Sequence, residues 1–155
     1  MPAKKRVKLN TTFEIAEDSP GFLLWKAANA LQRSHAESLR DLDITTTQFS
    51  LLTCLVYLQQ SGDVTASRMV AHTGMDKMLV SDLLAALTKK QLVRRVPNPA
   101  DARSSLVRAT ASGQRVTNAA LQIIEALDAD FFSRVKNLKT LQAALRILIR
   151  EPDSA

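Results

Sequence analysis

The sequence predicts a mainly helical fold with one small β-hairpin, and three observations lead to that prediction. Glycine is scarce, with 4 in 155 residues, and long stretches are rich in side chains that favour helices. Two helical patterns, Thr65–Thr73 and Asp76–Lys90, follow one another after a short break. Two strand-like runs, Leu92–Val96 and Leu106–Thr110, then flank a turn-rich tip. Helix, turn, helix and hairpin in this order indicate a winged helix-turn-helix, with the hairpin as its wing.

Longer helices are expected on both sides of this unit. Ser19-Pro20 has the pattern of an N-cap followed by a first helical residue, and this helix extends to about residue 40. A mostly apolar helix spans Thr47–Gln60, and a long helix runs from a cap at Thr110 to about Val135. We therefore expect the outer helices to add apolar surface that a small winged-helix core cannot cover.

The last predicted helix carries apolar side chains at steps of three, four and three, the spacing of a coiled-coil seam. The members of this seam are Leu138, Leu141, Leu145 and Leu148. Burial in a homodimer is the expected solution, and packing within one chain is the alternative. The expected organisation is a basic tail over residues 1–12 and one domain over 13–155. That domain has a winged-helix lobe at about 45–110 and dimerisation helices at about 19–41 and 111–150.

The net charge of +6 is unevenly distributed. Residues 65–110, the predicted helix-turn-helix and wing, carry eight basic and three acidic side chains. Residues 11–64 instead carry three basic and seven acidic ones. A basic face on that segment is what binding to a polyphosphate requires, so double-stranded DNA is the expected partner. The tail adds four basic residues, which either resemble a nuclear localisation signal or give nonspecific phosphate affinity.

The sequence lacks the residue patterns that an enzyme or a metal-binding protein requires. His35, His72 and Cys54 fall on three different predicted helices without metal-ligand spacing, and neither a phosphate-binding loop nor a nucleophile motif is present. We therefore expect no enzyme activity, no metal and no cofactor. Cys54 lies in an apolar run and is expected in the core. One cysteine and the absence of a long apolar run indicate a cytoplasmic protein without a membrane partner.

Five segments resemble the MarR family of bacterial transcription regulators, in the family's order and spacing. They are Thr47–Leu52, Met75–Leu84, Lys89–Arg95, Asn98–Arg103 and Ala109–Gly113. They are similar, in turn, to the start of the family's second helix, its recognition helix, the entry to the wing, the Asp-x-Arg wing signature and the exit from the wing. The resemblance implies a homodimer on a pseudopalindromic duplex, with the recognition helices in two successive major grooves. It also implies that Arg103 reaches a minor groove and that Asp101 fixes the wing loop.

The side chains expected at the DNA come from both helices of the motif and from the wing. They are Thr65, Ser67, Lys77, Met78, Ser81, Asp82, Arg94, Arg95, Asp101 and Arg103. Several have a simpler alternative. Thr65 and Ser67 can clamp phosphate or only cap a helix, Asp101 can be an ordinary turn residue, and Arg103 can be a solvated charge. Met78 can contact a thymine methyl group or belong to the core.

The sequence departs from the family pattern at three positions. Ala102 replaces a second wing arginine, and Gln91 replaces the usual helix-ending glycine, which leaves the geometry of that turn open. Asp82 stands where a basic residue is common. Its carboxylate can accept a hydrogen bond from cytosine N4, or it can pair with Lys77 or Lys89 along the helix.

The expected function is sequence-specific binding of an operator, acting as a repressor. A small aromatic or lipophilic ligand between the dimerisation helices and the lobe could modulate it. Trp25, His35 and Tyr57 could line that pocket, and Arg33 or His72 could meet a carboxylate. The alternative is an architectural protein that binds DNA without sequence preference and without an effector. Steep salt dependence with no preferred site would favour that alternative.

Overall fold

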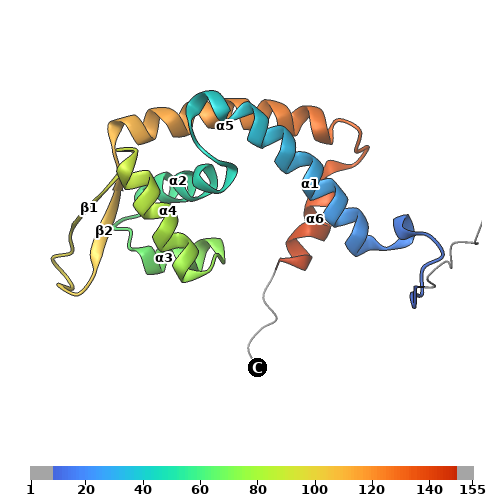
Figure 1. Cartoon of the computed structure of the whole chain (residues 1–155), viewed down its shortest axis with the longest axis horizontal. Coiled ribbons are helices and arrows are strands. Elements are labelled where there is room, and N and C mark those ends of the chain that lie inside the picture. Colours follow the sequence, from blue (N-terminus) through green and yellow to red (C-terminus); the bar gives the residue numbers. More distant parts are fainter. Residues whose placement is uncertain (1–8, 150–155) are drawn as a thin grey trace, which may run out of the picture.

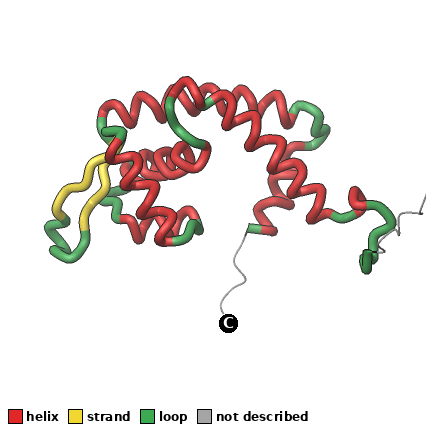
Figure 2. Tube along the Cα trace, viewed as in Figure 1, coloured by secondary structure: helices red, strands yellow, loops and turns green. Residues whose placement is uncertain are grey.

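The computed structural model describes residues 9–149 and shows a helical protein with one two-stranded antiparallel sheet (Figures 1 and 2). The basic segment 1–8 and residue 150, which the sequence analysis included in its tail and last helix, lie outside the described residues. The helices are α1 (Pro20–Ser38), α2 (Thr46–Gln59), α3 (Ala66–Thr73), α4 (Lys77–Lys89), α5 (Ala111–Phe132) and α6 (Leu138–Leu148). The strands are β1 (Val93–Pro97) and β2 (Ser105–Ala109). No described helix has both the length and the apolar character needed to cross a membrane.

Side-chain caps begin the helices where the sequence predicts them. Ser19 Oγ accepts from Phe22 N at 3.3 Å, with Pro20 in the first turn of α1. At the start of α2, the side chains of Thr45 and Gln48 form a capping box. Thr110 Oγ1 accepts from Gly113 N at 3.0 Å at the start of α5. Because each cap satisfies backbone N–H groups that a helix leaves free, these short-range patterns fix the element boundaries.

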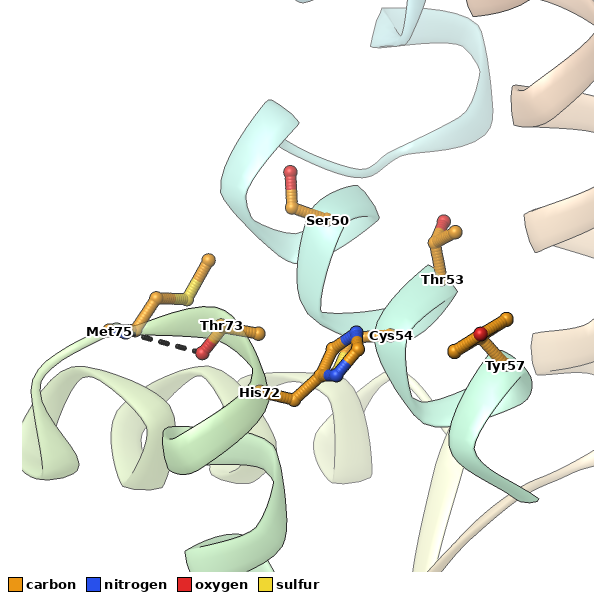
Figure 3. A pocket seen from close by; sticks show the side chains of 7 residues that line it. All are labelled: Ser50, Thr53, Cys54, Tyr57, His72, Thr73 and Met75. Atoms are coloured by element: carbon orange, nitrogen blue, oxygen red, sulfur yellow. Dashed lines mark hydrogen bonds between the residues drawn. The ribbon is translucent and has the colours of Figure 1, made fainter. Parts of the chain in front are cut away.

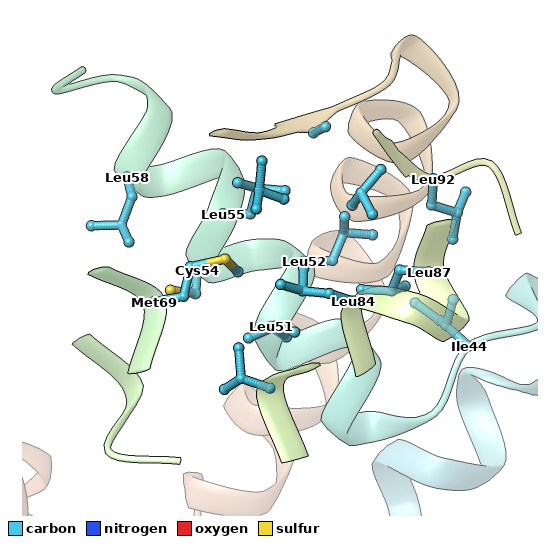
Figure 4. Close-up of a cluster of buried hydrophobic side chains, with 14 of the residues drawn as sticks. Ile44, Leu51, Leu52, Cys54, Leu55, Leu58, Met69, Leu84, Leu87 and Leu92 are labelled. Carbon is cyan, nitrogen blue, oxygen red and sulfur yellow. The ribbon is translucent and has the colours of Figure 1, made fainter. Parts of the chain in front are cut away.

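A hydrophobic core joins α2, α3, α4 and the hairpin into a lobe (Figure 4). Leu51, Leu52 and Leu55 of α2 are fully buried against Leu84 and Leu87 of α4. The core also takes in side chains outside the predicted lobe boundaries of 45–110. These are Leu39 and Ile44 on one side and Ala120 and Ile124 on the other. The N-terminal half of α5 is therefore packed as part of this lobe.

The hairpin is displaced by one residue from its prediction at both strands. Val93 pairs with Ala109 and Pro97 with Ser105. Thr110 lies outside the strand because its side chain caps α5, and its N–H donates to Leu92 O at 3.0 Å. A third segment joins the sheet edge, since Val107 N donates to Val64 O at 2.8 Å. That contact attaches the hairpin to the segment that leads into α3.

The outer helices form the other part of the molecule. Figure 1 shows α5 extending from the hairpin toward α1 and α6, which lie together at the end away from β1 and β2. Neither α1 nor α6 contains a buried residue. The long helix ends at Phe132 rather than near Val135, and Asn137 caps the separate helix α6 by accepting from Thr140 N at 3.0 Å. The apolar faces of these helices are thus left largely open in one chain.

Candidate nucleic-acid interface

Helix α4 has one buried face and one free face, as the predicted recognition helix requires. Asp76 caps it by accepting from the backbone N–H groups of Met78 and Leu79, at 2.7 and 3.3 Å. Its buried face, which includes Val80, packs into the core. The side chains expected at the DNA from this helix, Lys77, Met78, Ser81 and Asp82, are all exposed. The helix could therefore lie in a major groove with the side chains that are expected at the DNA uncovered.

Helix α3 packs against α4. Met69 is completely buried in the core of the lobe, whereas Ala71 of the same helix is exposed. Gly74 ends α3 in the left-handed region, with φ of 67°. Thr65 Oγ1 caps the helix by accepting from Arg68 N at 3.2 Å, so the capping alternative for Thr65 is realised. Ser67 is exposed in the first turn and is free to meet a phosphate.

The hairpin carries arginines on exposed positions of β1. Arg94 and Arg95 are exposed, and Arg94 lies directly opposite Arg108 of β2. Two cations at opposed positions repel each other. Asp63, in the loop between α2 and α3, offsets this repulsion by binding the guanidinium of Arg108. This contact links residues 45 positions apart, so short-range patterns in the sequence did not predict it.

A second arginine stiffens the same loop. Arg68 donates from Nη1 to Asp63 O and from Nη2 to Ser61 Oγ, both at 2.7 Å. The loop that holds Arg108 is therefore itself held by α3. Because one loop binds both α3 and the hairpin, the position of the wing is tied to the helix-turn-helix.

The tip of the wing presents Arg103 to solvent. Its side chain is 94% exposed, and its Nε–H donates to Asp101 Oδ1 at 3.4 Å. The same carboxylate oxygen accepts from Arg103 N at 3.0 Å. Asp101 thus braces both the turn backbone and the guanidinium, as the sequence analysis proposed. Asn98 and Ser104, whose side chains hydrogen-bond at 2.7 Å across the tip, are further structural residues that the sequence analysis did not single out.

The base of the wing is packed with little room. Gln91 adopts a left-handed conformation with φ of 58°, so this glutamine keeps the turn that glycine normally makes. Gly113 lies so close to the chain that a Cβ atom there would stand 2.0 Å from Leu92 O. Thr110 Oγ1 donates to Gln91 O at 2.8 Å from the same corner. Glycine at 113 is therefore required by a long-range contact.

The residues expected to bind an effector are only partly brought together. Tyr57 stacks on His72 with ring centroids 5.7 Å apart, and both line a hollow of about 550 Å³ between α2 and α3 (Figure 3). His35 lines a neighbouring cavity of about 450 Å³, where its Nε2 lies 2.8 Å from Asp128 Oδ1. Ser50 and Met75 line both cavities. Trp25 lies apart from them, stacked on Phe22 near the start of α1.

One of the residues that line the first hollow carries an unsatisfied polar atom. Thr53 Oγ1 is buried and has no hydrogen-bond partner within the described part of the chain. Cys54 also lines the hollow, and burial raises the pKa of its thiol, against a smaller lowering effect of Arg68. Cys54 is therefore a buried, weakly reactive thiol, as expected from its apolar run. In the described residues, no three acidic, histidine or cysteine side chains gather as a metal site would require.

The seam predicted on the last helix is divided in the structure. Leu141 and Leu145 are half-buried and line an entirely apolar groove with side chains of α1 and α5. Leu138 and Leu148 are exposed. Ile147, which the sequence analysis did not include, is 69% exposed. The seam residues thus face both their own chain and the solvent.

Comparisons with known proteins agree with this geometry. The model of the MarR family matches residues 44–105. Over 142 residues the chain is 33% identical to an uncharacterized HTH-type transcriptional regulator, YdcH, of Bacillus subtilis, covering 91% of this chain and 97% of that protein.

Solved structures share the fold. A mutant MarR from E. coli complexed with operator DNA has a TM-score of 0.76 at 24% identity, covering 90% of this chain and 100% of that one. The S. aureus MepR–DNA complex has a TM-score of 0.75 at 22% identity, with coverages of 86% and 95%. CouR of Rhodococcus jostii bound to p-coumaroyl-CoA has a TM-score of 0.74 at 22% identity, with coverages of 87% and 93%.

Proposed function

Because the chain belongs to the MarR family of transcriptional regulators, we propose that it is a homodimer that represses transcription from a pseudopalindromic operator. Members of this family are regulators and not enzymes. The DNA complexes of MarR and MepR, which share this fold, support DNA as the partner. A dimer seated on two successive grooves covers duplex that a polymerase would need, so occupancy alone is enough for repression.

One observation carries this proposal: the free face of α4 and the exposed guanidinium of Arg103 project from a single lobe. The lobe fixes their relation, since β1 contacts α4 and the loop at Asp63 holds the hairpin. A helix in the major groove and an arginine in the adjacent minor groove then bind one face of the duplex. We propose that Lys77, Ser67 and the strand arginines Arg94 and Arg95, which are all exposed, bind the phosphates around them.

The proposed dimer is supported by the apolar groove between α1, α5 and α6. The groove has no polar lining atom, and its residues include Leu24, Leu31, Phe131 and Leu145. Exposed apolar side chains, among them Trp25 at 61%, continue from it along α1. A single folded chain rarely leaves so much contiguous apolar surface in water. A second copy of the chain, joined to the first by a two-fold axis, would cover both faces at once.

The proposed effector site is the pair of adjacent cavities around Ser50 and Met75. Their lining includes the stacked rings of Tyr57 and His72 and the side chain of Thr53, whose hydroxyl is buried and has no partner among the described residues. A planar aromatic molecule could stack on the rings. It could also accept a hydrogen bond from Thr53 once that side chain rotates its buried hydroxyl toward the hollow. Because the cavity at His35 lies between α2 of the lobe and the helices α1 and α5, a ligand there would change the separation of the two recognition helices. That separation must stay near 34 Å to match one turn of DNA.

The direct test of sequence-specific binding is selection of sites from a random duplex library at near-physiological salt. We expect an inverted repeat with half-sites about one turn apart. No enriched sequence, with binding lost steeply as salt rises, would establish the architectural alternative instead.

The wing is tested by replacing Arg103 with alanine. We expect Arg103→Ala to weaken specific binding about tenfold, since a well-placed arginine contact is worth about 1.4 kcal/mol or more. The control is Arg115→Ala, which removes the same charge from an exposed position of α5. Equal binding by the two variants, measured by titration of the selected duplex, would refute the role of the wing.

The effector site is tested by Thr53→Val. We expect the variant to be more stable than the natural protein by about 1 kcal/mol, since it removes a buried hydroxyl without a partner. It should also lose the thermal stabilisation that a panel of aromatic carboxylic acids gives the natural protein. Lower stability, or unchanged stabilisation by the acids, would remove Thr53 from the site.

A further inference from the structure

The free face of α4 is unusual for a surface that approaches phosphate. Met78 is 74% exposed near the start of the helix, and Asp82 is exposed one turn later. Ser81 and Ala85, which are also exposed, are small. Small side chains beside two longer ones allow the helix backbone to come close to base edges. The face therefore offers one apolar and one acidic contact at the centre of the proposed interface.

The structure removes one explanation for Asp82. The sequence allows the carboxylate to pair with Lys77 or Lys89, but among the described residues Asp82 forms no ion pair. Phosphates on both sides of a groove would repel an unpaired carboxylate. It can stay there at low cost only if a base donates a hydrogen bond to it.

Only two major-groove edges carry such a donor, the amino groups of cytosine and adenine. Adenine also presents the acceptor N7 beside its amino group, and this lone pair repels the second carboxylate oxygen. Guanine presents only acceptors, and thymine presents an acceptor and a methyl group. The carboxylate of Asp82 therefore fits cytosine best and excludes guanine most strongly.

The side chain of Met78 fits the remaining apolar feature of the groove. A thioether chain has no strong hydrogen-bonding group, so it gains most by covering the 5-methyl group of thymine. Met78 and Asp82 are four residues apart, which corresponds to about 6 Å along the helix axis. A DNA strand rises about 3.4 Å per base, so the two contacts fall about two base pairs apart.

We propose that Asp82 and Met78 determine the operator sequence, through a cytosine read by Asp82 and a thymine about two base pairs away contacted by Met78. This inference rests on the proposed function and adds the chemistry of the half-site to it. It assigns to Asp82 a second effect, because its negative charge lowers the affinity for every other sequence.

Parallel site selections test the role of Asp82. The natural protein, Asp82→Ala, Asp82→Asn and the control Glu125→Ala, which removes an exposed acid from α5, are used under one set of conditions. We expect cytosine in the half-site for the natural protein and the control. Asp82→Ala should lose the preference at that position by about tenfold and bind unrelated DNA more tightly. Asp82→Asn should shift the preference to adenine, which an amide binds through N6 and N7.

Methyl deletion in the duplex tests the role of Met78. Each thymine of the selected half-site is replaced in turn by uracil, which keeps the base pair and removes only the methyl group. At one position we expect a loss of about fourfold for the natural protein and none for Met78→Ala, as burial of one methyl group predicts. Melting temperatures of all variants show whether any change comes from misfolding.

The outcomes separate the two levels of the account. If the natural protein enriches no sequence, the proposed function fails and this inference fails with it. If it enriches a sequence that Asp82→Ala enriches unchanged, the inference about Asp82 is wrong and the proposed function stands. If no uracil substitution weakens binding, or if Met78→Ala responds like the natural protein, the inference about Met78 is wrong.

Discussion

The two ends of the molecule differ in how far their apolar side chains are buried. In the lobe formed by α2, α3, α4 and the hairpin, leucines such as Leu51 and Leu84 are fully buried. Helices α1 and α6 have no buried residue, although they carry Leu24, Trp25 and Ile147. Helix α5 belongs to both ends, since its first half packs into the lobe and its last turn lines the apolar groove.

This difference in burial indicates that DNA binding and dimerisation use different parts of the chain. The lobe buries its apolar side chains within one chain, so it can hold α4 and the wing in a fixed relation without contacts from another chain. The outer helices leave apolar surface that one chain cannot cover, and we attribute that surface to the partner in the dimer. In the proposed dimer, the segments that read DNA differ from the segments that pair the two chains, and the long helix α5 connects them.

The strongest way to break this division is to remove α6 by truncation after Val135. We expect the dimer to be lost, because the groove loses Leu141 and Leu145 and its α1 face becomes exposed. The lobe should keep its own thermal transition, since no α6 residue belongs to its core. Light scattering and calorimetry measure the two effects. A stable dimer after truncation would show that α6 is not part of the interface.

A smaller change should damage the lobe alone. Gly113→Ala places a Cβ atom 2.0 Å from Leu92 O, which is backbone and cannot move aside easily. We expect a loss of about 3 kcal/mol in the free energy of unfolding, as for severe overpacking. The control is Gly21→Ala in α1, where the nearest atom is 3.9 Å away. Similar melting temperatures for the two variants would contradict the close contact at the base of the wing.

The smallest predicted effect concerns the turn between α4 and the hairpin. Gln91 has φ of 58°, a conformation that costs an L-residue more than it costs glycine. Gln91→Gly should therefore stabilise the protein by about 1 kcal/mol without changing its oligomeric state. Chemical denaturation measures the change. A destabilised variant would show that the glutamine side chain contributes more than the turn geometry costs.

Short-range patterns predicted much of the fold. Ser19 and Thr110 cap helices as expected, because a cap depends on residues within one turn. The four side chains of α4 that were expected at the DNA are all exposed. The Asp101 brace was predictable because its two partners are two residues apart.

Contacts between segments that are distant in the sequence could not be predicted from short-range patterns. The ion pair of Asp63 with Arg108 depends on how a loop and a strand meet. The separation of Trp25 from Tyr57 depends on the direction in which α1 leaves the lobe, which no local pattern encodes. The division of the seam at Leu141 and Leu145 depends likewise on the turn between α5 and α6.

The most direct test of the central claim is the spacing of the half-sites. The selected inverted repeat is compared with the same duplex after insertion of five base pairs between its halves, about half a helical turn. If the outer helices hold two lobes at a fixed separation, the inserted duplex should bind only as tightly as a single half-site. Equal affinity for the two duplexes would contradict the account, because it would mean that each lobe binds independently of its partner.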